Sequence, residues 1–191
     1  MTGTPEESGA VRAGRLLVAT PALTDPHFTR TVVLLLQHDA DEGALGIVLT
    51  RPSGTGVGEV VPSWSGLAAG PAVVFTGGPV QPEAAICLGR VVPGTPAGPA
   101  FAPLADAQLG TVDLDAPPTD GLRHVRLFAG YAGWGAGQLE DEVAEGAWWV
   151  LDALPGDAFA ARPERLWGDV LRRQGLPLAW QATAVADPRL N

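Results

Sequence analysis

Residues 125–152 read VRLFAGYAGWGAGQLEDEVAEGAWWVLD, and the interpretation of the rest of the chain depends on this stretch. The short apolar run at 125–129 predicts a strand, because such runs bounded by turn residues favour extended backbone. Glycines at 130, 133, 135 and 137 then predict a tight turn. A helix can begin only after Gly137. The stretch therefore predicts a strand, a glycine-rich turn, a short helix and a second strand.

The predicted helix after Gly137 is amphipathic. Leu139 and Val143 lie four residues apart and share one face, whereas most of the acidic residues lie on the other. Acidic residues in the first turn suit the positive end of the helix dipole. Gly146 is well placed to end the helix in a left-handed conformation. In the strand that follows, Trp148 and Trp149 must point to opposite faces of a sheet.

A glycine-rich loop between a strand and a helix also raises the hypothesis of a phosphate site. Glu140, Asp141 and Glu142 would repel an anion at this helix start, and the loop contains no Lys, Ser or Thr. The glycine spacing also differs from both standard nucleotide-binding motifs. We therefore predict that the glycines allow Tyr131 and Trp134 to pack in a tight connection, and that they do not hold a nucleotide.

Composition predicts one globular domain at 14–191, preceded by a disordered tail at 1–13. The hydrophobic content of 46% is typical of a chain that buries a core, and 25 glycines and 18 prolines indicate many loops. No apolar run reaches the roughly 18 residues of a membrane helix, and the first residues lack an apolar signal core. A single cysteine, Cys87, rules out an intrachain disulfide. We expect a cytoplasmic protein without a membrane partner.

The formal net charge of -9 weighs against direct nucleic-acid binding, which depends on cationic contacts to phosphate. All twelve basic residues are arginines. Four of them, at 162, 165, 172 and 173, fall in a helix predicted at 162–174. A solvated helix face explains this cluster more simply than a basic binding patch.

The remaining pattern consists mainly of strands separated by turn residues. Strands are predicted at 16–19, 31–37, 44–50, 73–75 and 84–92, with edge strands or loops at 101–104 and 110–114 and a closing strand at 178–185. Residues 31–50 read as a hairpin. A weak, proline-broken helix is predicted at 57–67. This order is not the regular alternation of a doubly wound fold, so we predict an α+β fold with a strongly curved or barrel-like mixed β-sheet and a few short flanking helices.

Catalytic chemistry has few candidates in this chain. His27 lies near Asp25, and His38 precedes a run of acidic residues at 39–42. A metal site needs three or four converging ligands, and a solvated hairpin turn explains 39–43 more simply. Cys87 lies in an apolar strand, where burial makes a thiol unreactive. We predict no catalytic residues, no metal and no cofactor; the alternative is a hydrolase or metal-dependent enzyme that uses His27, His38 and nearby carboxylates.

Several segments together resemble the AlgH/YqgE family of bacterial proteins. The resemblance rests on GRLLVATP at 14–21, DPHFTRTVV at 25–33, GALGIVLTRP at 43–52, GGPV at 77–80 and GYAGWGAGQLE at 130–140. It implies an α+β fold with a barrel-like sheet, and no established catalytic residues. Members of the family are labelled as transcriptional regulators. This chain departs from the family pattern at Thr20, at Thr50, where asparagine is usual, and at 85–89, where a histidine is usual.

The loops that carry these motifs predict a binding surface. We expect it to be formed by Asp25, Arg51, Gly78, Tyr131, Trp134 and Gln138. The predicted function is that of a cytosolic, non-enzymatic binding or regulatory protein. The sequence does not identify its protein or small-molecule partner.

Overall fold

The computed structural model describes residues 9–105 and 108–183, and the predictions for 1–8 and 184–185 lie outside these ranges. Its strands are β1 (Arg15–Ala19), β2 (Val32–Asp39), β3 (Gly43–Val48), β4 (Pro52–Gly56), β5 (Val73–Thr76), β6 (Val80–Val91), β7 (Phe101–Pro103), β8 (Leu109–Val112), β9 (Leu122–Trp134) and β10 (Trp148–Asp152). The α-helices are α1 (Val57–Val60), α2 (Gln138–Ala144), α3 (Leu166–Arg172) and α4 (Leu178–Gln181). Short 3₁₀ helices cover Pro62–Leu67, Asp157–Phe159 and Pro163–Arg165.

All the strands belong to one curved sheet in the order β10-β1-β2-β3-β9-β6-β8-β7. The strands β4 and β5 branch from this path, because β5 pairs with both β4 and β9. The β5–β9 pair is parallel, whereas the pairs along the main path are antiparallel. The predicted α+β class with a curved mixed sheet is therefore confirmed.

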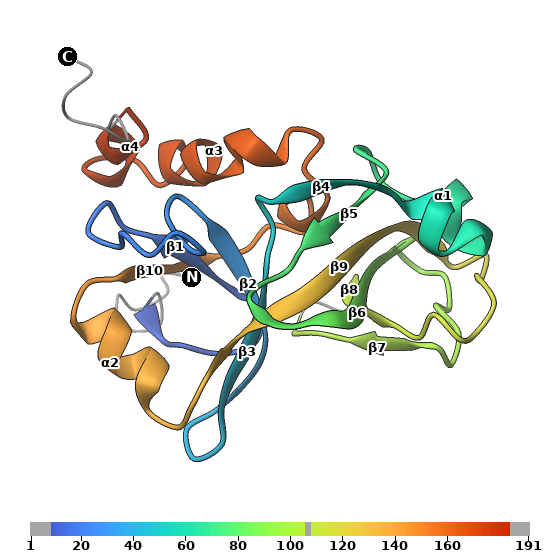
Figure 1. The fold of residues 1–191 in the computed structure, drawn as a ribbon, viewed down its shortest axis with the longest axis horizontal. Coiled ribbons are helices and arrows are strands. Elements are labelled where there is room, and N and C mark those ends of the chain that lie inside the picture. Colours follow the sequence, from blue (N-terminus) through green and yellow to red (C-terminus); the bar gives the residue numbers. More distant parts are fainter. Residues whose placement is uncertain (1–8, 106–107, 184–191) are drawn as a thin grey trace.

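The long strand β9 joins the two halves of the molecule, as Figure 1 shows in yellow. Its first part pairs with β6, and residues 132–134 pair with β3. The prediction that the strand ends at 129 and a turn begins at Gly130 is therefore wrong. Gly130 instead bends the strand with a φ of 70°, and pairing with β3 keeps residues 131–134 extended. The turn is confined to residues 135–137.

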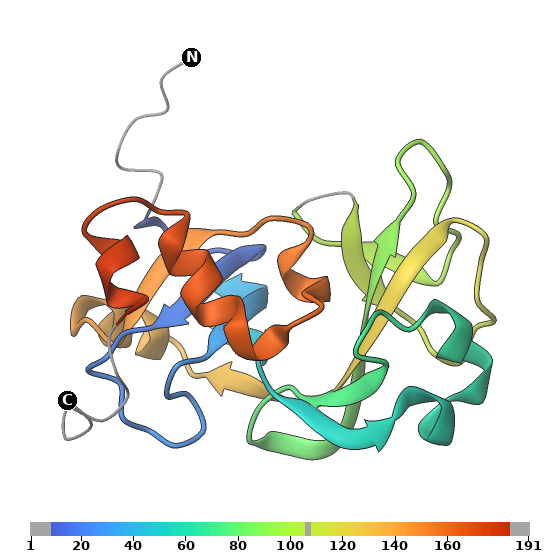
Figure 2. The same cartoon turned by 90° about the horizontal axis from the view of Figure 1, so that it is seen from above.

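The half that contains β10, β1, β2 and β3 is buried on both faces. Helix α3 covers one face, as Figure 2 shows from above, and α2 lies beside the other. The continuous apolar run in β2 predicted this double burial, and its first five residues are all buried. Trp148 packs in the cluster on the α2 face and Trp149 packs against the cluster on the α3 face, as predicted from their alternation.

The other half, formed by β4 to β8 and part of β9, has its own cluster under α1 and the following 3₁₀ helix. This cluster consists of Val57, Trp64, Cys87, Val91, Val112, Leu122, Val125 and Leu127. The predicted weak helix at 57–67 is confirmed in broken form, because α1 ends at Val60 and a 3₁₀ helix begins at Pro62.

Arg126 ties β9 to two neighbouring loops from inside the protein. Its side chain is almost fully buried and donates hydrogen bonds to the carbonyls of Gly70, Ala158 and Ala160 at 2.7, 3.1 and 3.2 Å. The guanidinium also lies 4.4 Å from the Phe75 ring centroid. Burial lowers the pKa of Arg126 to about 10, so the side chain remains charged at neutral pH. Arg126, which interrupts the apolar run at 125–129, therefore has a structural role.

Two local predictions fail, and each failure has a physical reason. Residues 178–181 form helix α4, because the segment packs on α3 and finds no strand partner among the described residues. Residues 52–56, which are absent from the predicted strands, form β4, because they pair with β5 through an irregular register. Both outcomes depend on tertiary contacts that local propensity does not encode.

Candidate functional site

The glycine turn after β9 is held by a carboxylate on α2. Both indole N–H groups of Trp134 and Trp148 donate to Glu142 Oε2, at 2.9 and 2.8 Å. The side-chain amide of Gln138 donates to Glu142 Oε1 at 2.9 Å, and its Oε1 accepts a hydrogen bond from Gly135 N at 3.0 Å. We call Trp134, Gln138, Glu142 and Trp148 the tryptophan lock. Its polar groups are paired with one another.

Phe28 closes the tryptophan lock from the loop before β2. The Phe28 ring lies 5.5 Å from the Trp148 ring and 6.2 Å from the Trp134 ring, and the two indoles are 6.1 Å apart. Aromatic contacts at these distances add to the stabilisation from burial. Only 6% of Trp134 and 3% of Trp148 is exposed. Trp134 and Gln138, predicted as binding residues, therefore lie within a packed and internally satisfied network.

A second polar contact joins α2 to the β2–β3 hairpin. His38 Nε2 lies 2.6 Å from Glu140 Oε1. This hydrogen bond, together with one from the Glu140 backbone, lowers the pKa of the Glu140 carboxyl group. Beside it lies a cavity of about 380 Å³ whose lining includes His38, Trp134 and the carboxylates Asp39 and Glu42. His38 thus pairs with an acid from a distant helix and not with the acids that follow it in sequence.

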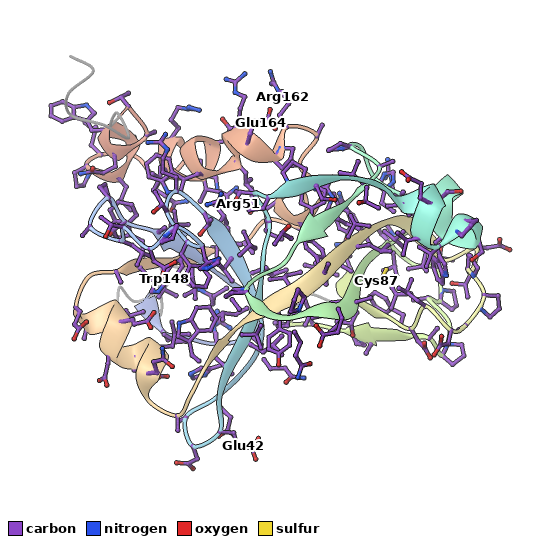
Figure 3. All side chains as sticks on the ribbon, in the orientation of Figure 1. Glu42, Arg51, Cys87, Trp148, Arg162 and Glu164 are labelled. Carbon is purple, nitrogen blue, oxygen red and sulfur yellow. The ribbon has the colours of Figure 1, made fainter. Side chains whose placement is uncertain are left out.

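A different cavity, of about 340 Å³, lies where the 25–30 loop meets the end of β3 and the start of β6. It is lined by Pro26, His27, Val48, Thr50, Arg51, Pro52, Thr76, Gly78 and Pro79. We call it the Arg51 cavity. Figure 3 labels Arg51 near the middle of the molecule, between the two halves of the sheet. The lining contains one permanent cation and no carboxylate.

Arg51 is tethered to the loop by one of its nitrogens. Its Nη2 donates to the carbonyl oxygens of Pro26 and Thr29 at 3.3 and 3.2 Å. No carboxylate in residues 9–105 or 108–183 forms an ion pair with Arg51. Asp25, also predicted as a binding residue, shapes the loop instead: its Oδ1 accepts the His27 N–H at 2.8 Å. The site thus has a positioned guanidinium with donors left over.

Thr50 contributes a buried hydroxyl group to the same region. The residue is only 9% exposed, and its Oγ1 has no hydrogen-bond partner within the described part of the chain. Leaving a buried hydroxyl unpaired costs about 1–3 kcal/mol, so such groups are uncommon in folded proteins. Thr50 thus lines the Arg51 cavity with its hydroxyl group buried and unpaired in the wall.

Gly78 brings the backbone of the 77–80 turn against β9. Its φ is 155°, and a Cβ there would overlap the backbone of Tyr131. Any side chain would push the turn away from β9 and deform the wall of the Arg51 cavity. Of the six predicted binding residues, Arg51 and Gly78 thus line this cavity, Asp25 shapes its loop, and Tyr131 supports it through the backbone.

The alternative of a histidine-based enzyme has little geometric support. His27 lines the Arg51 cavity, whereas His38 lines the cavity beside Glu140. Within the described residues, no three His, Cys, Asp or Glu side chains form a metal-binding group. Cys87 is buried, and burial raises the pKa of its thiol to about 12, which suppresses the nucleophilic thiolate.

Two further cavities lie against the sheet. One, of about 340 Å³, is lined mainly by apolar residues of β5, β6 and β9 with Glu83 among them. The other, of about 430 Å³, is lined by residues that include Leu36, Ile86 and Leu104, with no charged side chain. Neither combines a cation with buried hydroxyl groups.

Reasoning from the sequence missed the acceptor of the tryptophan lock, and the predicted binding surface contained only two of the nine residues that line the Arg51 cavity. Glu142 was grouped with the other acids of α2, although it alone lies six residues before one tryptophan and eight after another. That spacing is a usable signal, because a buried indole N–H requires an acceptor. Thr50 and Thr76 gave no such signal, since the fold alone brings the segment after β3 and the end of β5 to the same cavity.

Comparison with known proteins gives consistent matches along the chain. A family model described as AlgH-like matches residues 16–179. A UPF0301 protein of Streptomyces coelicolor is 52% identical over 198 residues that cover 100% of both chains. A UPF0301 protein of Thermobifida fusca is 51% identical over 187 residues, which cover 93% of this chain and 94% of the relative.

Two solved structures resemble the fold. The crystal structure of a Corynebacterium diphtheriae protein has a TM-score of 0.87 and 33% identity, and the match covers 93% of this chain and 94% of that one. The solution structure of the AlgH protein of Pseudomonas aeruginosa has a TM-score of 0.63 and 28% identity, covering 97% and 98%. Both likenesses extend over nearly the whole molecule.

Proposed function

Because this chain belongs to the AlgH-like family, we propose that it acts as a non-enzymatic binding protein whose ligand site is the Arg51 cavity. A single observation carries the proposal: a guanidinium positioned by two backbone carbonyls lines a cavity without a carboxylate to neutralise it. Ligand pockets combine a preformed cavity with a few placed polar groups, and the Arg51 cavity has both features.

The hydrogen-bond pairing of the two regions of the predicted surface supports the Arg51 cavity as the ligand site. The indole N–H groups and the Glu142 carboxylate of the tryptophan lock already form hydrogen bonds within the lock, so few of its donors and acceptors are available to a ligand. The Arg51 cavity retains unused donors on Arg51 and an unpaired hydroxyl on Thr50. Phe28 connects them, because it packs on both indoles while the neighbouring Pro26 and His27 line the cavity.

A regulatory role in the cytoplasm is the finer part of the proposal. Ligand binding at the Arg51 cavity would act on the 25–30 loop, and this loop also carries Phe28, which packs against the two indoles of the tryptophan lock. Binding would then change the loop and the adjoining surface together. Among residues 9–105 and 108–183, every helix falls short of the length and apolar character that a membrane crossing demands. The net charge of -9 makes a protein or small molecule a better partner than DNA.

Native co-purification with a blocked cavity tests the proposal. The tagged chain is expressed in a bacterium that has its own AlgH-like protein and is captured under stringent washing. Mass spectrometry then identifies the proteins and small molecules that were captured with it. The blocking variant is His27→Trp, which fills the cavity from an exposed position, and the control is Thr24→Trp, an exposed position in the same loop outside the cavity lining.

The expected result is a ligand or partner recovered with the wild type and with Thr24→Trp, and lost with His27→Trp. Recovery of the same species with all three proteins would place binding elsewhere. Turnover of a recovered small molecule by the purified protein would contradict the non-enzymatic part of the proposal.

A further inference from the structure

The Arg51 cavity differs in charge from its surroundings. The whole chain carries a formal charge of -9, yet this cavity is lined by a guanidinium and an imidazole with no carboxylate. The cavity beside His38 contains Asp39 and Glu42, and the apolar cavity on β5 contains Glu83. Of the four cavities described above, only the Arg51 cavity combines a cation with the absence of acids in its lining.

From this charge pattern we infer that the ligand of the Arg51 cavity carries an oxyanion, a carboxylate or a phosphate, that binds to the free edge of the Arg51 guanidinium. The inference rests on the proposed function and adds the chemical class of the ligand. A guanidinium pairs with carboxylate and phosphate through two parallel hydrogen bonds, and it keeps its charge at every physiological pH.

The contacts of Arg51 orient it for this role. The two bonds from Nη2 to the Pro26 and Thr29 carbonyls fix the plane of the guanidinium, so less side-chain freedom is lost on binding. Those bonds use one nitrogen. Within the described residues no other hydrogen bond or ion pair of Arg51 is formed, which leaves Nη1 and Nε for an acceptor.

Two threonines and one acid are further polar residues in or beside the cavity. Thr50 and Thr76 line the cavity, and the Thr50 hydroxyl lacks a partner in the part of the chain that the structure describes. Oxyanions accept several hydrogen bonds, so the hydroxyl of Thr76, which is an exposed residue of the lining, can add a donor beside the guanidinium. Asp25 is the nearest acid in sequence, but it lies outside the cavity lining and its Oδ1 is bonded to the His27 N–H.

The test is titration of ¹⁵N-labelled full-length protein with inorganic phosphate in one arm and acetate in the other, followed by NMR. We expect saturable shifts of the His27, Thr76 and Gly78 amide signals in at least one arm. Saturation by phosphate alone identifies a phosphate ligand, saturation by acetate alone identifies a carboxylate ligand, and saturation by both supports a general oxyanion site. Absence of saturable shifts in both arms would overturn the inference.

Matched variants assign the effect to Arg51. Arg51→Gln should weaken binding roughly tenfold or more, because a charge-assisted hydrogen bond is lost. Arg162→Gln removes the same charge from an exposed position just before the 3₁₀ helix Pro163–Arg165, which does not line the cavity and which Figure 3 labels apart from Arg51, and should change the affinity less than about twofold. Equal affinity of Arg51→Gln and wild type would overturn the inference.

A second pair of variants covers the case in which Arg51→Gln loosens the loop. Thr76→Glu adds a carboxylate to the cavity wall and leaves the contacts of Arg51 with Pro26 and Thr29 in place. It should weaken anion binding roughly tenfold, whereas Thr76→Gln should not, because like charges repel. Unchanged binding in Thr76→Glu would contradict an anion site.

The oxyanion inference and the proposed binding function can fail independently of each other. If the native pulldown recovers a neutral or cationic species that His27→Trp displaces, the binding function stands and the oxyanion inference fails. If neither the pulldown nor the titration detects binding at the cavity, both fail together.

Discussion

The tryptophan lock and the Arg51 cavity are neighbours that treat their polar groups in opposite ways. In the lock, two indole N–H groups and one amide converge on Glu142, and the two indole rings are buried. In the cavity, Arg51 and Thr50 keep unused hydrogen-bonding capacity. A fully paired polar network stabilises a fold, whereas unpaired groups beside a cavity are available to a ligand. Hydrogen-bond pairing therefore distinguishes the structural residues of the lock from the candidate binding residues of the cavity more clearly than the sequence motifs do.

The largest effect is expected where the lock is removed. Trp134→Ala should lower the free energy of unfolding by about 3–5 kcal/mol, because a buried indole leaves a large void. Chemical denaturation measures the change. The matched control is Trp180→Ala, since Trp180 is 75% exposed, and it should change stability by less than about 0.5 kcal/mol. Similar losses in the two variants would break the comparison.

Removal of the central acceptor is the next largest change. Glu142→Ala leaves two buried indole N–H groups without their acceptor, and each such group costs about 1–3 kcal/mol. Denaturation and near-ultraviolet circular dichroism of the tryptophans report the loss. Glu145→Ala removes the same charge from an exposed position beyond the end of α2 and should be neutral or slightly stabilising. A neutral Glu142→Ala would show that the indoles find other acceptors.

Arg51→Gln should have a smaller effect on stability. It removes two exposed hydrogen bonds to the loop, so we expect a loss of about 0.5–1 kcal/mol in the same denaturation experiment. Arg51→Lys should be nearly neutral. A loss as large as that of Glu142→Ala would mean that Arg51 belongs to the architecture, and the contrast between the two regions would disappear.

The smallest effect is expected at the His38–Glu140 pair, on the solvent side of the lock. The pKa of Glu140 is lowered in the folded state, so its stabilisation is present above the unfolded carboxyl pKa of about 4.3 and is lost as pH falls through the lower folded value. Glu140→Gln should therefore be less stable than wild type at pH 7, and the difference should shrink as pH falls through the lowered folded-state pKa of Glu140. The measurement is denaturation across this pH range. A constant difference would rule out the assigned cause.

Much of the fold was predictable because its signals are local. The β2–β3 hairpin, the start of α2 after Gly137 and the opposed faces of Trp148 and Trp149 follow from periodicity and turn residues alone. The extension of β9 to Trp134 was not predictable, because pairing with β3 overrides the glycine content of the segment. The same applies to α4, which depends on packing against α3.

The candidate site was predictable only in part. The motifs led to Arg51 and Gly78, which line the cavity, and to Trp134 and Gln138, which belong to the lock. The motifs alone do not distinguish these two roles, because the roles depend on which donors meet an acceptor in space. The spacing of Glu142 from the two tryptophans was a usable signal for the lock, but its indole partners come from different strands and meet it only in the folded chain.

The central position of β9 has a consequence for synthesis on the ribosome. β9 begins at Leu122, so β3, β5 and β6 emerge while the strand that joins them is still untranslated. Until then each of these strands presents an unpaired edge on which a neighbouring nascent chain could add. The two halves of the sheet are therefore joined only after the chain from residue 122 onward has emerged, and the edges of β3, β5 and β6 that pair with β9 remain open until then.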